Sequence, residues 1–119
     1  MRCKKRRLRL RNVDEDCAQA RFGIGELIHH LLFDYRGVVY DVDPVFCGSE
    51  EWYRQVARSA PPKDRPWYRV LVNGAEHVTY VAERNLERDT LQTPISHPGI
   101  AYFFERFENG YYIPRRLSQ

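Results

Sequence analysis

Asp41 and Asp43 form the most chemically suggestive pair in the chain, because they stand two residues apart within a run of valine and tyrosine. If that run is a strand, residues i and i+2 point to the same face and the two carboxylates lie side by side. Paired carboxylates can exchange protons with a substrate or hold a divalent cation. A polar strand end, with Asp43 shaping the turn before Pro44, accounts for the same residues, and we favour that interpretation.

The remaining motifs do not combine into a catalytic or metal centre. His29 and His30 are adjacent, so on a strand their side chains point to opposite faces and cannot both ligate one metal ion. The segment Gly23-Ile24-Gly25 lacks the Gly-Lys-Ser/Thr of a phosphate-binding loop and indicates a tight entry into a core strand. We therefore expect a protein that is not an enzyme and that holds no cofactor or metal.

The two carboxylates depend on residues 33–44, which we expect to form the central strand. Val38, Val39, Tyr40 and Val42 are β-branched or aromatic, the types that pack well on a pleated surface. Gly37 permits a bulge or a close approach of a neighbouring backbone. Strand alternation predicts a core face and an opposite face, made respectively of Val38, Tyr40 and Val42, and of Val39, Asp41 and Asp43.

Turn signals divide the rest of the chain into short strands and one helix. We expect Phe22 and Ile24 to begin the core. Asn73-Gly74 and Asn109-Gly110 predict hairpin turns, because both central positions of a type I′ turn need a positive φ. Ser49 is suited to begin a short helix. The further strands are expected over 26–33, 67–72, 75–81, 102–107 and 111–113, a pattern that favours one mainly β domain.

Positive charge is concentrated at one end of the sequence. Residues 1–12 hold seven of the 19 Lys and Arg residues and no acid, so the remainder carries 12 cations and 16 acids. Charge runs of this kind are usually disordered, and we expect a disordered basic arm. Contact of the arm with nucleic acid or an acidic protein is the alternative.

The cysteines and the apolar segments indicate in which cellular compartment we expect the protein. Cys3, Cys17 and Cys47 follow no CxxC pattern, which favours reduced thiols in the cytoplasm over a disulfide framework or a zinc site. No apolar run approaches the roughly 20 residues that cross a bilayer, and we expect no membrane association. The basic arm also lacks the apolar centre of a secretory signal.

Several segments carry a joint resemblance to a known family. They are, in order, Phe22-x-Ile24-Gly25, His30, Tyr35-Arg36-Gly37-Val38-Val39-x-Asp41-Val42-Asp43-Pro44, Pro66-Trp67-Tyr68-x-Val70-Leu71, Tyr80-Val81-x-Glu83-x-Asn85-Leu86 and Pro94-Ile95-x-His97-Pro98. Together they resemble the YccV-like, hemimethylated-DNA-binding family, which includes the bacterial heat shock protein HspQ. On this basis we divide the chain into an extension over 1–20, a domain over 21–114 and a tail over 115–119.

The resemblance implies a small SH3-like β-barrel and two functions. The function we expect is that of a non-catalytic, heat-shock-linked factor that promotes ATP-dependent proteolysis of damaged or regulatory proteins, with a Lon-like protease as partner. The alternative is binding of hemimethylated DNA. Similar domains occur in adaptors for Clp proteolysis and in an F-box protein, and the shared theme is delivery of proteins for degradation. Exposed strand edges would also allow a homo-oligomer.

Candidate contact residues follow from these two functions. For a protein partner we expect Tyr35, Arg36, Asp41, Asp43, Trp67 and Tyr68, since aromatic and arginine side chains dominate interface binding energy. For DNA we expect Arg36 together with the arm residues Arg2, Lys4, Lys5, Arg6, Arg7, Arg9 and Arg11. The sequence shows no recognition helix with a row of side chains for base edges, so we expect salt-sensitive binding driven mainly by the arm.

Overall fold

A computed structural model describes residues 20–57 and 59–116. The predicted arm over 1–12 and its expected disorder lie outside this part of the chain. In the described part the elements are β1 (Leu27–His30), β2 (Arg36–Asp43), α3 (Glu50–Val56), β3 (Trp67–Val72), β4 (Val78–Ala82), the 3₁₀ turn η1 (Glu83–Asn85), β5 (Leu86–Arg88), α4 (Ile100–Phe103), β6 (Phe104–Glu108) and β7 (Tyr111–Pro114).

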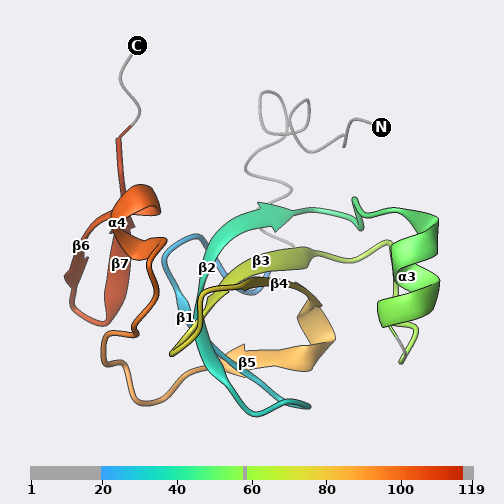
Figure 1. Ribbon diagram of the computed structural model, residues 1–119, viewed down its shortest axis with the longest axis horizontal. Helices are drawn as coiled ribbons and strands as arrows, with labels where there is room; N and C mark the ends of the chain where they lie inside the picture. The colour runs from blue at the N-terminus through green and yellow to red at the C-terminus, as the bar shows by residue number, and fades with distance from the viewer. Residues whose placement is uncertain (1–19, 58, 117–119) are drawn as a thin grey trace.

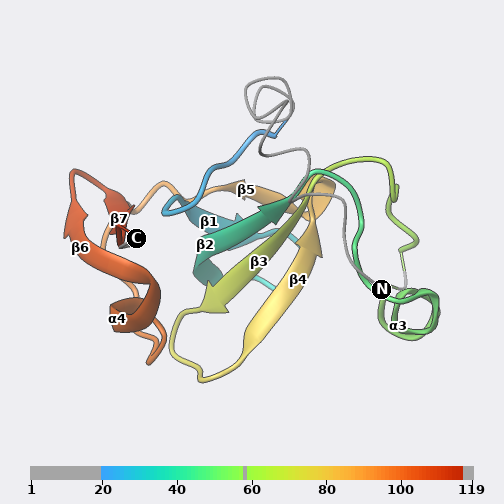
Figure 2. The same cartoon turned by 90° about the horizontal axis from the view of Figure 1, so that it is seen from above.

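Five of these strands form one antiparallel sheet in the order β4-β3-β2-β1-β5. The sheet coils around a core, and the η1 turn connects its two edge strands, β4 and β5 (Figure 1). Helix α3 lies on one side of the sheet, whereas α4 and the β6–β7 hairpin lie on the opposite side (Figure 2). The prediction of a mainly β, SH3-like barrel is therefore confirmed.

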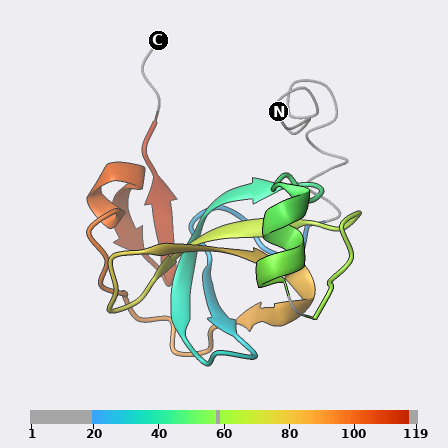
Figure 3. The same ribbon diagram turned by 45° about the vertical axis from the view of Figure 1, so that its right-hand side comes forward.

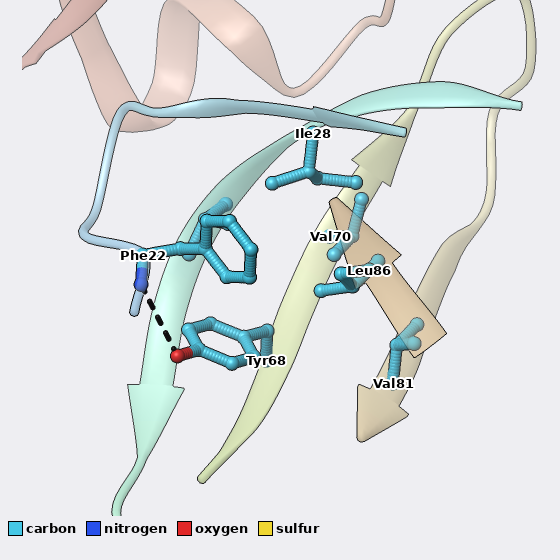
Figure 4. Close-up of a cluster of buried hydrophobic side chains, with 7 residues drawn as sticks. Phe22, Ile28, Tyr68, Val70, Val81 and Leu86 are labelled. Atoms are coloured by element: carbon cyan, nitrogen blue, oxygen red, sulfur yellow. Dashed lines mark hydrogen bonds between the residues drawn. The ribbon is translucent and has the colours of Figure 1, made fainter. Parts of the chain in front are cut away.

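The interior of the coiled sheet is filled by a first core cluster, whose members come from strands β1 to β5 and from the segment before β1 (Figure 4). Tyr68 is fully buried there, and its ring meets that of Phe22 edge to face at a centroid distance of 5.4 Å. The backbone N–H of Phe22 donates to the Tyr68 hydroxyl at 3.3 Å. The prediction that Phe22 begins the core is confirmed, but the same prediction for Ile24 is wrong because Ile24 is about half exposed.

Strand β2 is buried on both faces. Val39 belongs to the first core cluster, whereas Val38 belongs to a second core cluster between the sheet and the β6–β7 hairpin. A register shift against β3 falls between Val39 and Asp41, so Val42 packs on the side of Val39. The predicted alternation therefore fails in the second half of the strand, because a bulge reverses the phase of the side chains.

The two predicted hairpin turns have different outcomes. Asn109 and Gly110 both have positive φ, at 54° and 83°, and the tight β6–β7 turn is confirmed. Between β3 and β4 only Gly74 has a positive φ, and the connection is longer than two residues. The longer loop is held by distant partners, because the Asn73 N–H donates to the Arg36 carbonyl at 2.8 Å and the Gly74 N–H to that of Ser96 at 2.8 Å.

The expected helix is confirmed as α3, where the Ser49 hydroxyl accepts from the Trp52 N–H at 3.0 Å. The short helix α4 was not predicted, since its four residues follow a Pro-Gly turn and carry no capping side chain.

Cys47 is disulfide-bonded, so the prediction of reduced thiols is wrong at this residue. None of the helices in the described residues is long and apolar enough to span a bilayer.

Replacing Gly37 by alanine is expected to destabilise the sheet. A Cβ at this position would lie 2.5 Å from Val70 Cγ1 and 2.6 Å from the Leu71 carbonyl oxygen, so β2 and β3 would have to separate. We expect the free energy of unfolding to fall by about 1–3 kcal/mol, as for other overpacked interiors, in urea denaturation followed by tryptophan fluorescence. Gly23→Ala is the matched control, because nothing lies within 4 Å of its added Cβ. Equal stability of the two variants would contradict this packing.

Candidate functional site

The described surface carries a groove of about 520 Å³. It lies where α3, β3 and β4 meet the loop over residues 31–35, which we call the rim loop, and Figure 3 shows α3 in front of the sheet at this place. Its lining is mostly apolar or aromatic and includes Leu32, Phe33 and Tyr35 of the rim loop, Trp52 and Val56 of α3, Trp67 and Arg69 of β3, and Val78, Thr79, Tyr80, Val81 and Ala82 of β4.

An aromatic cluster attaches α3 to the sheet and forms one wall of the groove. The Trp52 ring on the helix lies 6.1 Å from the Trp67 ring and 5.8 Å from the Tyr80 ring, centroid to centroid. Phe46, in the segment before the helix, is 4.8 Å from Trp67. The Trp67 indole N–H donates to the Pro62 carbonyl at 3.0 Å, so its polar atom is satisfied although the side chain is buried. The wall is therefore preformed by packing.

A buried carboxylate lies behind this wall. Asp43 accepts hydrogen bonds from the Tyr80 hydroxyl at 2.6 Å and from the Arg69 guanidinium at 3.2 Å, and Arg69 also stacks over the Tyr80 ring at 4.4 Å. Burial, with the hydrogen bond to Asp43, raises the pKa of Tyr80. Tyr80 is thus neutral at physiological pH, and the Asp43 charge is neutralised by Arg69.

The opposite wall is the rim loop, which presents the most exposed apolar side chains near the groove. Phe33 is 75% exposed and Leu32 is 59% exposed. Tyr35 ties the loop to β4, because its hydroxyl lies 2.7 Å from Thr79 Oγ1. Burial raises the pKa of Tyr35, so this phenol also stays neutral. The groove accordingly offers apolar surface, neutral phenol hydroxyls and one guanidinium, that of Arg69, which is paired with Asp43.

The structure does not bring the predicted carboxylate pair together as a reactive centre. Asp43 is 1% exposed and paired with Arg69, whereas Asp41 is half-buried and accepts from the Val42 N–H at 2.9 Å. Both carboxylates follow the bulge in regular register with β3, opposite Arg69 and Trp67, but their different burial and different partners keep them from forming an open pair. Among the described residues, no group of three or more His, Cys, Asp or Glu side chains is placed to hold a metal ion.

The predicted aromatic contacts divide between core and groove. Tyr68 is fully buried in the first core cluster, and Trp67 is 2% exposed within the aromatic cluster. Both rings hold the fold together, Trp67 also lines the groove, and contact of either ring with a partner stays a prediction. Of the predicted aromatic residues, Tyr35 is the one that lies half-buried at the groove.

Arg36, predicted for both kinds of partner, is held in an internal ion pair. Its Nε lies 2.8 Å from Asp89 Oδ2, its terminal nitrogen donates to the Thr93 carbonyl, and the Asp89 side chain is buried. The guanidinium therefore fastens β2 to the segment after β5, and its contact with DNA or a partner stays a prediction. The predicted arm residues, Arg2, Lys4, Lys5, Arg6, Arg7, Arg9 and Arg11, lie outside the described residues.

Sequence reasoning missed most of the groove. Leu32 and Phe33 were assigned to the first strand, but β1 ends at His30 and the chain turns at Asp34, which has a φ of 57°. Val56 and Val78 come from separate elements and meet only in the folded chain. The available signal was the triplet Leu31-Leu32-Phe33 next to Asp34, which lacks the polar alternation of a half-buried strand.

Comparison with known proteins adds a family and a set of relatives. The family model described as "Hemimethylated DNA-binding protein YccV like" matches residues 20–111. F-box only protein 21 of Homo sapiens is 32% identical over 103 residues, and the mouse protein of the same name, from Mus musculus, is 33% identical over 95 residues. The first alignment covers 85% of this chain but only 16% of the human protein, so the chain spans about one sixth of the length of these relatives.

The Arg36–Asp89 ion pair predicts that mutation of Arg36 lowers the stability of the fold. Arg36→Gln leaves a buried carboxylate without its cation, and we expect the free energy of unfolding to fall by about 3–5 kcal/mol in urea denaturation. Arg54→Gln, at an exposed position of α3, is the control and should change the free energy of unfolding by less than about 0.5 kcal/mol. An Arg36→Gln protein as stable as wild type would remove the structural role assigned to this residue.

Proposed function

This chain belongs to the YccV-like family, and we propose that its folded domain is a non-catalytic protein-binding module that takes up an extended, apolar segment of a partner protein in the groove. We further propose that this binding serves ATP-dependent proteolysis of damaged or regulatory proteins, with a Lon-like protease as partner, in the cytoplasm. The observation that carries the proposal is the pairing of an apolar groove with an open strand edge.

Strand β4 forms one edge of the five-stranded sheet, and all five of its residues line the groove. Among the described residues, no strand pairs with its outer edge. An extended segment can add to such an edge through backbone hydrogen bonds, while alternate side chains enter the neighbouring apolar groove. Damaged proteins expose segments of this kind, so the site matches the clients of a degradation factor.

The charge of the described domain also favours a protein partner over a nucleic-acid backbone. Residues 20–57 and 59–116 carry 11 Lys and Arg residues against 13 Asp and Glu residues. Several of these cations are paired with carboxylates, including Arg36 with Asp89, Arg69 with Asp43 and Arg88 with Glu26. Phosphate contacts need clustered, available cations, and this part of the chain offers few.

The link to degradation is supported by the kind of protein in which related domains occur. The relatives named F-box only protein 21 contain a region similar to this chain, and family resemblance also points to factors that deliver proteins for destruction. The groove gives such factors a common physical task, which is to hold a client segment without regard to its exact sequence. A homo-oligomer, also predicted, would place several grooves on one assembly.

Binding of hemimethylated DNA is the second candidate, and the family description favours it by name. The basic arm, with seven cations in residues 1–12, supplies the charge that the described domain lacks. Arm contacts to phosphate would be salt-dependent and would not by themselves distinguish a methylated strand, because sequence and methyl groups are read at base edges.

Replacing two groove residues is expected to weaken client delivery. We expect Leu32→Ser with Phe33→Ser to reduce the protein's stimulation of Lon-dependent turnover of an unfolded substrate by about tenfold, as for loss of interface anchors. The control is Leu91→Ser, because Leu91 is 62% exposed, much as Leu32 is, and does not line the groove. Equal stimulation of turnover by wild type, the double variant and Leu91→Ser, or no stimulation by wild type, would contradict the proposal.

Deleting residues 2–12 tests the DNA candidate. We expect the truncated protein to lose most of its affinity for duplex DNA in fluorescence anisotropy, since the arm carries seven positive charges. A slope of log affinity against log salt that falls by several units on truncation would confirm arm-driven binding. Retained affinity with a preference for hemimethylated over unmethylated duplex would instead show that the barrel itself reads DNA.

A further inference from the structure

The rim loop is held by two adjacent histidines that use opposite protonation states. His29 lies at the surface of β1, and both of its ring nitrogens contact carboxylates. Nε2 is 2.6 Å from Asp34 Oδ1, and Nδ1 is 2.8 Å from Glu87 Oε2. A carboxylate accepts and cannot donate, so both nitrogens must carry a proton for both contacts to be hydrogen bonds. The geometry thus requires the charged imidazolium at His29.

His30 requires the neutral ring. Its Nδ1 accepts from the backbone N–H groups of Leu32 and Phe33, each at 3.1 Å, so this nitrogen must be unprotonated. Its ring lies between those of Phe33 and Tyr35, at centroid distances of 4.9 Å on each side. Those ring faces would attract a cation, but a proton on Nδ1 would face two backbone donors and leave both without an acceptor.

We propose that His29 and His30 act together as a pH-sensitive clamp that keeps the rim loop in the conformation that forms one wall of the groove. The clamp rests on the proposed function only in that the loop borders the proposed binding site. Within the described residues, each histidine holds a different part of the loop: His29 holds Asp34, and His30 holds the backbone of Leu32 and Phe33.

The surroundings of each ring set the direction in which it titrates. The hydrogen bonds to Asp34 and Glu87 raise the pKa of His29, whereas burial, with a smaller effect of the His29 charge, lowers the pKa of His30. On β5, Glu87 lies opposite His29 and Leu86 opposite His30. On β2, Arg36 lies opposite His29, with its guanidinium on Asp89. The His29 ring therefore faces the carboxylates of Asp34 and Glu87, whereas His30 faces apolar side chains such as Leu86 and Phe33.

These directions give the clamp a window of pH. The contribution of His29 is complete below the ordinary histidine pKa and is lost as pH rises through its raised value in the folded protein. The contribution of His30 is complete above the ordinary value and is lost as pH falls through its lowered value. Both contributions are present between the two folded-state pKa values, a range that includes the ordinary value of about 6.5.

Nuclear magnetic resonance of the full chain, with no partner added, tests the clamp. At neutral pH we expect the His30 ring to carry its proton on Nε2. On acidification from about pH 7 until the ring signals of His30 show that it has protonated, the exchange of the Leu32 and Phe33 amides, corrected for its intrinsic pH dependence, should become about tenfold faster. A proton on Nδ1 at neutral pH, or protonation of His30 without change at these amides, would overturn the proposal.

Two variants separate the clamp from a general effect of acid. His30→Asn places a non-titrating acceptor near the position of Nδ1, so its Leu32 and Phe33 amides should stay protected over the same range. His77→Asn removes an exposed histidine elsewhere and should behave as wild type. Should His30→Asn fail to fold, the wild-type titration decides alone. Loss of partner binding in the degradation assay with the amides responding as expected would defeat the proposed function and leave the clamp standing.

Discussion

The burial of β2 on both of its faces is the constraint from which the rest of the structure follows. Val39 fills the interior of the coiled sheet, while its neighbour Val38 closes the space beneath the β6–β7 hairpin. The bulge after Val39 then turns the second half of the strand, which sends Asp43 inward to Arg69 and Tyr80. One strand thereby joins two hydrophobic clusters and supplies the polar anchor behind the groove.

The features that could be predicted from sequence are those set by neighbours along the chain. The Ser49 cap, the Asn109-Gly110 turn and the valine-rich central strand depend on local conformational preferences, and each is present as expected. The features that could not be predicted depend on distant partners. The bulge in β2 shows only against β3, and the Asn73 turn is opened by bonds to Arg36 and to Ser96.

The candidate site shows the same division. Aromatic and arginine residues were expected at a contact surface, but Trp67, Tyr68 and Arg36 are consumed by packing and by the ion pair with Asp89. The exposed apolar surface comes instead from Leu32 and Phe33. The sequence pattern placed both residues in the strand predicted over 26–33. Residue type alone did not separate these cases, because burial of a large aromatic ring depends on elements far apart in sequence.

The central claim is that the groove beside β4 receives an extended segment of another protein. The most direct measurement is an amide chemical-shift map of the full chain with reduced, carboxymethylated α-lactalbumin, a permanently unfolded protein, as the probe. The account predicts shifts confined to β4, the rim loop and the facing side of α3, with slowed exchange along the outer edge of β4. Shifts confined to the β6–β7 hairpin, or no shifts at saturating probe, would contradict it.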